Sequence, residues 1–173
     1  MLRGADVTLV TGETSLTPPP FVDTIRIKSA HDLFEAVTSR SEEQDIIIKA
    51  AAVADYRPAV VSDEKVKKSD GDLSLAERTE DTLSYLGAHK RPGQLLCGFA
   101  METSQLEERA RGKLERKNLD LIAANNLKVA GAGFGTDTNV ITLIDKQQTR
   151  HLEQMSKEAA AMEILTVLRD MMK

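Results

Sequence analysis

Cysteine, histidine and aromatic side chains are scarce in this chain of 173 residues, which has one cysteine, three histidines, no tryptophan and 3% aromatic residues. Cys97 alone cannot form an internal disulfide, and the cysteine and histidine residues show no zinc-ligand spacing, so the composition favours a reducing cytoplasm. The shortage of rings argues against a base-stacking platform for single-stranded nucleic acid. Disulfides and structural metals are therefore excluded as sources of stability.

An excess of positive charge and long apolar runs are also missing. The chain has 23 Lys and Arg residues against 27 Asp and Glu residues, a net charge of −4, which argues against a protein held to nucleic acid by its overall field. No apolar stretch approaches the roughly 18 residues that cross a bilayer, and residues 1–4 lead into polar sequence without a signal-peptide core. We therefore expect a cytoplasmic protein that binds neither nucleic acid nor membranes.

Strand and helix patterns alternate along the chain. Apolar and β-branched runs predict strands at 7–10, 23–28, 46–48, 73–76, 94–100, 119–123, 140–144 and 149–152. Amphipathic patterns predict a helix capped by Ser29 and helices at 81–89, 104–118 and 156–172, with a surface loop at 57–72. This alternation predicts a Rossmann-like three-layer α/β/α fold with a mostly parallel sheet and a late antiparallel hairpin.

The segments after Ile48, after Phe99 and after Ala123 are the first places to search for a ligand, because open α/β sheets bind ligands beyond the carboxyl ends of their strands. The run Ile46-Ile47-Ile48 predicts a strand covered on both faces. It continues into Ala50-Ala51-Ala52-Val53-Ala54-Asp55, whose small side chains let a ligand approach the backbone and whose Asp55 is an anionic acceptor. Tight helix packing with a capping Asp explains the same residues.

Lysines and arginines form two further candidate sites for anions. Lys65-Val66-Lys67-Lys68 lies in the polar loop, where ammonium groups could reach triphosphate oxygens, or could simply be solvated. In the helix predicted at 104–118, Arg109, Lys113 and Lys117 form a purely basic row at four-residue spacing. Like charges at that spacing repel by about 0.2–0.5 kcal/mol per pair, so a bound polyphosphate would relieve the repulsion; a solvated face is the alternative.

Two other features are assigned no chemistry. Gly131, Gly133 and Gly135 have the wrong spacing for a dinucleotide fingerprint and precede a strand where the fingerprint precedes a helix, which indicates a loop. Cys97 lies within an apolar strand without a basic neighbour in sequence, which predicts a buried inert thiol.

Four motifs in order carry a family resemblance over nearly the whole chain. They are residues 51–57 (AAVADYR), 65–68 (KVKK), 98–103 (GFAMET) and, after Lys113, 117–125 (KNLDLIAAN). This order resembles bacterial phosphopantothenate–cysteine ligase, also called phosphopantothenoylcysteine synthetase, which is often the carboxy-terminal half of the bifunctional coenzyme A biosynthesis flavoprotein. The resemblance implies CTP and Mg²⁺ as requirements, a homodimer, and no FMN or decarboxylation on this chain. A phosphopantothenoylcysteine decarboxylase domain or chain is an implied partner.

The resemblance also implies a reaction and its residues. Phosphopantothenate attacks the α-phosphate of CTP to give an acyl cytidylate and pyrophosphate, and the amine of L-cysteine then displaces CMP. Lys65 is the implied catalytic residue, Phe99 the wall of the cytosine pocket, and Lys113 and Lys117 the holders of the nucleotide. The implied CTP contacts are Ala50, Ala51, Ala52, Asp55, Lys65, Glu80, Asp81, Thr82, Leu83, Phe99, Lys113 and Lys117. The metal ligands are not identified.

The sequence departs from the family at two places. Residues 78–83 read Arg-Thr-Glu-Asp-Thr-Leu where the family usually has Lys-Asn-Pro-Asp-Ile-Leu. The family's glycine-rich first turn and its segment ending in Ser-Ser-Gly-Lys-Met-Gly, which contacts the acyl cytidylate, are not found here. We therefore expect one ligase-like domain over 1–173 that is truncated at its amino terminus. The alternative is a non-catalytic nucleotide-binding or partner-binding module derived from this enzyme.

Overall fold

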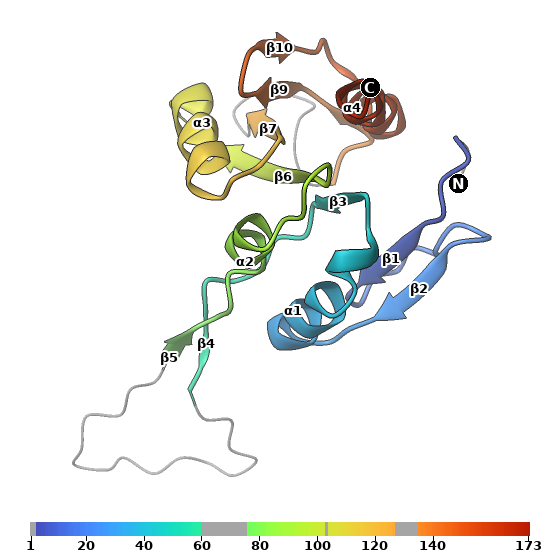
Figure 1. Ribbon diagram of the computed structural model, residues 1–173, viewed down its shortest axis with the longest axis vertical. Coiled ribbons are helices and arrows are strands. Elements are labelled where there is room, and N and C mark those ends of the chain that lie inside the picture. The colour runs from blue at the N-terminus through green and yellow to red at the C-terminus, as the bar shows by residue number, and fades with distance from the viewer. Residues whose placement is uncertain (1–2, 60–75, 103, 127–134) are drawn as a thin grey trace. The chain divides into compact units, whose positions relative to one another are not determined.

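The structure is a computed structural model that describes residues 3–59, 76–102, 104–126 and 135–173. These residues form two compact units (Figure 1). The first unit contains Met1–Ser39 and Ala52–Thr82, and the second contains Arg40–Ala51 and Leu83–Lys173. The single domain expected over 1–173 stays a prediction.

The first unit contains two small sheets and a helix. β1 (Thr8–Thr11) pairs in parallel with β2 (Asp23–Arg26), and β4 (Tyr56–Pro58) pairs antiparallel with β5 (Ala76–Arg78). The sequence predicted β1 and β2, but placed residues 57–72 in a loop. β4 was not predicted because its mostly exposed residues lack a period-two apolar pattern, and its pairing partners are about twenty positions away. The strand predicted at 73–76 overlaps β5 at Ala76, and residues 73–75 lie outside the described residues.

Helix α1 (Ala30–Thr38) begins where its capping signal predicts. The Ser29 hydroxyl accepts a hydrogen bond from the backbone N–H of Asp32 at 3.1 Å, and the Asp32 carboxylate accepts one from the backbone N–H of Ser29 at 2.9 Å. This reciprocal pair is a capping box, which satisfies two donors that a helix start otherwise leaves open. Leu33 is the buried residue of the helix.

A five-stranded sheet is the centre of the second unit. Its order is β10 (Thr149–His151), β9 (Ile141–Asp145), β7 (Leu121–Asn126), β6 (Leu95–Glu102) and β3 (Ile46–Lys49). β3, β6 and β7 are parallel, whereas β9 runs antiparallel to β7 and β10 antiparallel to β9. This arrangement confirms the predicted α/β fold with a parallel centre and a late antiparallel hairpin.

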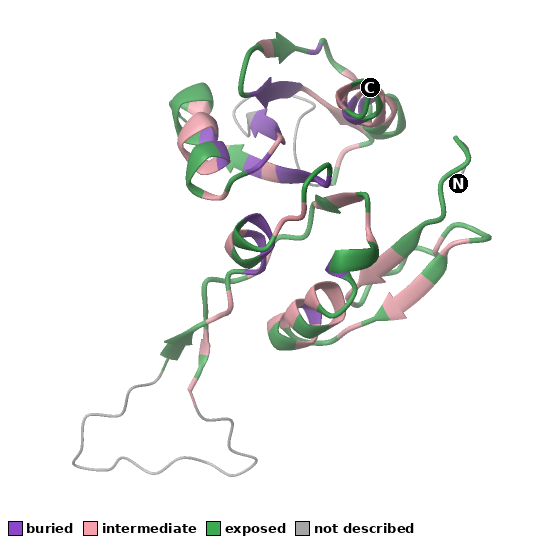
Figure 2. Cartoon of the chain, viewed as in Figure 1, coloured by how far each residue is buried: buried purple, intermediate pink, exposed green. Residues whose placement is uncertain are grey.

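Helices cover the two faces of this sheet. The core beneath α4 (Lys157–Met171) includes Cys97, Leu121 and Ala123, whereas α2 (Thr82–Ala88) contributes Leu83 beside Gly98, on the opposite face of β6. α3 (Leu106–Arg116) buries Ala110 and Leu114, which are not part of the α4 core. Figure 2 shows the buried residues concentrated in β6, β7 and β9. The second unit therefore has three layers.

Three short elements complete the second unit. A 3₁₀ helix, η1 (Ser41–Glu43), precedes β3, and β8 (Thr138–Asn139) pairs antiparallel with β11 (Met155–Ser156). Across the described residues, the structure has no helix of the length and apolarity needed to span a membrane.

The expectation that Ile46–Ile48 form a strand covered on both faces is wrong. β3 is the last strand of the five-stranded order, its residues are at most half-buried, and Ile48 is 40% exposed. A run of β-branched residues reports a preference for extended backbone, but the neighbours that cover a strand come from distant parts of the chain.

Candidate nucleotide site

Two residues that the sequence assigned to the same ligand meet at β6, one position past Gly98, which pairs with the last residue of β3, Lys49. The Lys113 ammonium, from α3, donates a hydrogen bond to the backbone carbonyl of Phe99 at 2.7 Å. Leu83 of α2 and Leu119, which follows α3, pack closely over Gly98: a Cβ there would lie 2.9 Å from Leu119 Cδ1 and 3.0 Å from Leu83 Cδ2. This position thus carries a half-buried ring and an adjacent cation.

The basic row of α3 is partly neutralised by the protein itself. Arg109 forms an ion pair with Glu102, at the end of β6, with 3.1 Å between Nη1 and Oε2. The sequence argument counted only charges on the helix and therefore missed Glu102, which the fold of β6 and α3 brings to Arg109. An anion is still favoured near Lys113 and Lys117, but repulsion along the row is a weaker reason for it than the sequence indicated.

The end of α3 is held by a close contact with α2. A Cβ at Gly87 would collide with the backbone carbonyl of Lys117, and the Asn118 side-chain amide donates to the Gly87 carbonyl at 2.9 Å. Asn118 has a φ of 48°, in the left-handed region that ends many helices. This contact fixes the backbone that carries Lys117.

The alanines after β3 belong to different units. Ala50 and Ala51 lie in the second unit, where the Lys49 ammonium donates to the Ala51 carbonyl at 3.1 Å. Ala52 lies in the first unit. All three are exposed, and their assignment to the nucleotide stays a prediction.

In the first unit, the backbone of Asp55 is tied to the segment that carries Glu80. The backbone N–H of Thr79 donates to the Asp55 carbonyl at 3.0 Å, and the Thr79 hydroxyl donates to the Ala54 carbonyl at 2.6 Å. Two segments that the sequence assigned separately to the nucleotide therefore lie side by side.

Glu80 is held by a histidine and an arginine. Its carboxylate lies 2.9 Å from His31 Nδ1 and 3.2 Å from Arg57 Nη1. A hydrogen bond from its own backbone N–H, then the hydrogen bond with His31, and the charge of Arg57 hold the pKa of Glu80 below its ordinary value. Its negative charge is thus already matched by protein groups, which suits it to orient Arg57 more than to contact a phosphate.

The other predicted residues are distributed as follows. Asp81 and Thr82 belong to the first unit and Leu83 to the second, where Leu83 is 4% exposed and its side chain serves the core. Lys65, the predicted catalytic residue, lies outside the described residues, as do Lys67, Lys68, Gly131 and Gly133. The assignment of these residues to a site stays a prediction.

Cys97 has the properties that its sequence position predicts. It is fully buried, and burial, with a smaller contribution from the negative charge of Asp120, raises the pKa of its thiol to about 12. A thiol that keeps its proton is a poor nucleophile.

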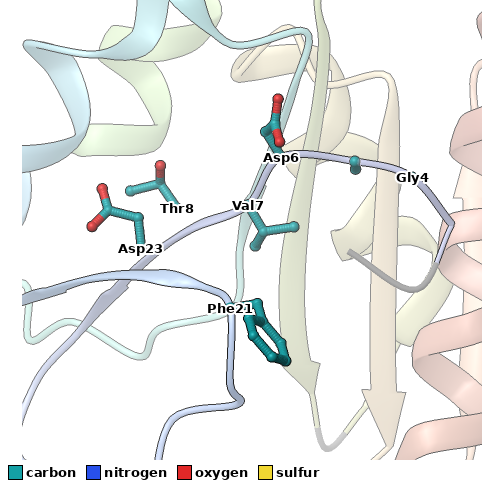
Figure 3. Close-up of a pocket in the computed structure, with 7 residues that line it drawn as sticks. Gly4, Asp6, Val7, Thr8, Phe21 and Asp23 are labelled. Carbon is teal, nitrogen blue, oxygen red and sulfur yellow. The ribbon is translucent and has the colours of Figure 1, made fainter.

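A surface hollow of about 450 Å³ lies at the amino end of β1 (Figure 3). Val7, Phe21, Asp6 and Asp23 are among its lining residues, and Phe21 is 93% exposed with a φ of 63°. None of the residues predicted for the nucleotide lines it. Its position before β1 is opposite to the strand ends where α/β sheets bind ligands, so we assign it no ligand.

No group of three or more His, Cys, Asp or Glu side chains in the described ranges could hold a metal ion. Sequence reasoning also left Asn125 unassigned, although it closes the last motif. Asn125 is 5% exposed near the carboxyl end of β7, and its Oδ1 has no hydrogen-bond partner in the described part of the chain. The available signal was a polar residue directly after the apolar run Ile122-Ala123-Ala124.

Comparisons with known proteins place the chain in a family. A family model described as DNA/pantothenate metabolism flavoprotein C-terminal domain matches residues 1–172. The chain is 48% identical over 165 residues to the coenzyme A biosynthesis bifunctional protein CoaBC of Bacillus subtilis (strain 168), covering 94% of this chain and 40% of that protein. It is 40% identical over 175 residues to the protein of the same name in Vibrio vulnificus (strain YJ016), covering 99% and 44%.

A crystal structure of the C-terminal domain of a CoaBC protein is similar over 98% of this chain and 78% of that one, with a TM-score of 0.81 and 43% identity. The chain spans less than half the length of the two CoaBC proteins. The resemblance carried by the four motifs is confirmed, and the chain belongs to the DNA/pantothenate metabolism flavoprotein C-terminal domain family.

Proposed function

We propose that this chain catalyses the CTP-dependent ligation of 4′-phosphopantothenate to L-cysteine in coenzyme A biosynthesis. Support comes from the family match over 1–172 and from the identity to proteins named for coenzyme A biosynthesis. In the proposed reaction, the substrate carboxylate attacks the α-phosphate of CTP and pyrophosphate leaves. The cysteine amine then attacks the acyl carbon of the cytidylate, and CMP leaves as the new amide forms.

The observation that carries this proposal is the hydrogen bond between the Lys113 ammonium and the Phe99 carbonyl. It fixes a cation beside the residue proposed to wall the base, one position past the point where the parallel strand β3 ends. A nucleotide seated there would have an aromatic side chain for its base and a positive charge for its phosphates. Attack of the substrate carboxylate on the α-phosphate needs such fixed positive charge, and it needs no side-chain nucleophile.

The remaining roles follow from charge. Lys117, at the end of α3, would add a second cation to the triphosphate. Lys65 is proposed to act on charge that develops at the α-phosphate, and Asp55 to contact CTP beside the backbone of Ala50–Ala52. Mg²⁺ is proposed to be held mainly by the triphosphate, because Mg²⁺ in nucleotide sites uses one or two carboxylates together with phosphate oxygens.

The first experiment measures pyrophosphate release from CTP by the chain 1–173, with and without 4′-phosphopantothenate, and then formation of the cysteine adduct. Release that depends on 4′-phosphopantothenate and is faster with CTP than with ATP is the expected result. Nucleotide binding without turnover would favour the alternative of a non-catalytic module. Equal use of CTP and ATP would contradict the cytosine pocket.

The second experiment replaces one lysine of α3. Lys113→Ala should weaken CTP binding at low salt by about tenfold. Hydrogen bonds to charged groups contribute about 1.5–3 kcal/mol, and the low end of that range applies because the Lys113 ammonium also donates to the Phe99 carbonyl. The deficit should shrink at high salt, because the field of a partly exposed ammonium is screened. Lys146→Ala, an exposed lysine in the turn between β9 and β10, removes the same charge and is the control. Equal affinities of the two variants would contradict the role of Lys113.

We further propose a homodimer, and association with a phosphopantothenoylcysteine decarboxylase domain or chain. Light scattering of the purified chain tests the first proposal, and co-purification with that decarboxylase tests the second. A cytoplasmic location is also proposed, with which the free thiol of Cys97 is compatible.

A further inference from the structure

Asn125 carries a buried oxygen for which the described residues supply no donor. The residue is 5% exposed, and its Oδ1 has no hydrogen-bond partner among them. Its neighbours across the sheet are Met101 in β6 and Ile141 in β9, whose side chains have no hydrogen-bond donor. Buried polar atoms in proteins are almost always paired, so an unpaired one calls for an explanation, and a bound ligand is one that the position of Asn125 allows.

A second amide that is buried among the described residues shows the contrast. Gln94, also 5% exposed, lies just before β6 at the amino end of the sheet. Its Nε2 donates to the carbonyls of Ser41 and Gln44, each at 2.6 Å. The described residues therefore satisfy a buried amide at the amino end of the sheet and leave the Asn125 oxygen without a partner near the carboxyl end, where open α/β sheets generally bind ligands.

Asn125 shares a face of the sheet with Phe99. Leu121 and Ala123 belong to the core beneath α4, and Phe99 packs against that core. Since side chains alternate along a strand, Asn125 lies on the same face as Ala123. Phe99 pairs in register with Ala123, which makes Asn125 its diagonal neighbour, one step nearer the carboxyl end. Diagonal positions on adjacent strands are within reach of one ligand ring.

We propose that Asn125 is the residue that recognises the cytosine base, with its Oδ1 accepting a hydrogen bond from the exocyclic 4-amino group. This inference rests on the proposed function, because it places the base of CTP against Phe99. Uracil carries a carbonyl oxygen where cytosine carries the amino group, so UTP would set one acceptor against another. The unpaired Asn125 oxygen would thus favour binding of CTP over UTP. Adenine also has an exocyclic amino group, so this contact does not explain a preference for CTP over ATP.

The test measures binding of CTP, UTP and a CTP analogue that lacks the 4-amino group to the chain 1–173 by titration calorimetry. The parent should bind CTP about tenfold to a hundredfold more tightly than UTP, which is the range expected when one hydrogen bond to a buried group is lost. Asn125→Leu should bring the ratio of the two affinities close to one, mainly through weaker CTP binding. The analogue should bind parent and variant alike.

A matched control and a second measurement keep the result unambiguous. Gln94→Leu replaces a buried amide of the same exposure, and should lower the thermal midpoint while the CTP-to-UTP ratio stays that of the parent. The analogue measured on the parent alone reports the contact even if Asn125→Leu does not fold.

Two outcomes overturn the inference, and they are distinguishable. Asn125 does not recognise the base if the parent prefers CTP over UTP and Asn125→Leu keeps that preference. The same conclusion follows if the parent binds the analogue as tightly as CTP. If the parent binds no CTP, the proposed function fails and the inference fails with it.

Discussion

Replacing Asp120 with asparagine would show how strongly burial determines the contribution of an ion pair to the stability of this protein. Both Asp120 carboxylate oxygens lie 2.8 Å from the Lys90 ammonium, and Oδ2 also accepts the backbone N–H of Leu96 at 2.8 Å. The side chains of Lys90 and Asp120 are only 12% and 17% exposed. Asp120→Asn keeps the shape of the side chain, but leaves a largely buried ammonium without its counter-charge.

The expected loss follows from these contacts. Removing one charge of a fully buried ion pair lowers the free energy of unfolding by about 3–5 kcal/mol, and a hydrogen bond to a charged group contributes about 1.5–3 kcal/mol. The small remaining exposure and the Asn118 carbonyl, 3.1 Å from the Lys90 ammonium, reduce the cost. We therefore expect the free energy of unfolding to fall by about 2–4 kcal/mol, which corresponds to a decrease in Tm of about 4–16 °C for a chain of this size.

Asp170→Asn is the matched control. Asp170 also lies 2.8 Å from a lysine ammonium, that of Lys173, but the two side chains are 49% and 71% exposed. Exposed pairs contribute little because water solvates both charges and the side chains lose conformational freedom when they pair. The control should therefore unfold at the same urea concentration as the parent.

Urea unfolding followed by circular dichroism gives the two midpoints, and hydrogen exchange of the Leu96 amide reports the site directly. Exchange at Leu96 should accelerate in Asp120→Asn and remain unchanged in Asp170→Asn. Equal shifts in the two variants, or a smaller shift in Asp120→Asn, would refute the reasoning that burial and not distance sets the strength of these pairs.

Three further predictions test local features. The pKa of Cys97 is raised from 9.0 to about 12, so between these pH values the folded thiol keeps its proton while the unfolded thiol loses it. The free energy of unfolding should therefore fall as pH rises above 9. Iodoacetamide at pH 8 should modify Cys97 only in urea, as measured by mass spectrometry. Gly87→Ala should lower the unfolding free energy by at least about 1–3 kcal/mol, since the new methyl group meets the Lys117 carbonyl; a Tm equal to that of the parent would contradict this. Ser29→Ala should cost about 1 kcal/mol in urea unfolding through loss of the cap of α1, whereas Ser29→Thr keeps the hydroxyl acceptor and should cost less.

Much of the secondary structure could be predicted from the sequence because its signals act within a turn or along one strand. The Ser29 cap marks the start of α1, and the closing helix predicted at 156–172 is α4, Lys157–Met171, capped by Ser156. The apolar run predicted at 94–100 is β6, Leu95–Glu102, which buries Cys97. Each of these depends on residues that are close together in the chain, so periodicity and capping chemistry are sufficient.

The nucleotide residues were assigned by motif, but their chemistry depends on partners that no local pattern contains. Lys113 binds the Phe99 carbonyl across a separation of 14 residues, and Arg109 meets Glu102 because α3 folds back beside β6. The helical spacing correctly predicts that Arg109 and Lys113 lie in one row. It contains no information about the Glu102 carboxylate, which belongs to a different element.

The sequence by itself therefore determined the family, the alternation of strands and helices, and the residue types that suit a triphosphate. Only the tertiary structure decided which strand is exposed and which polar atom is left open. Ile48 is exposed because β3 is the last strand of its sheet, and the Asn125 oxygen lacks a described donor because its cross-strand neighbours are Met101 and Ile141. Exposure and hydrogen-bond satisfaction depend on neighbours supplied by strand pairing, and pairing brings together residues that are distant in the sequence.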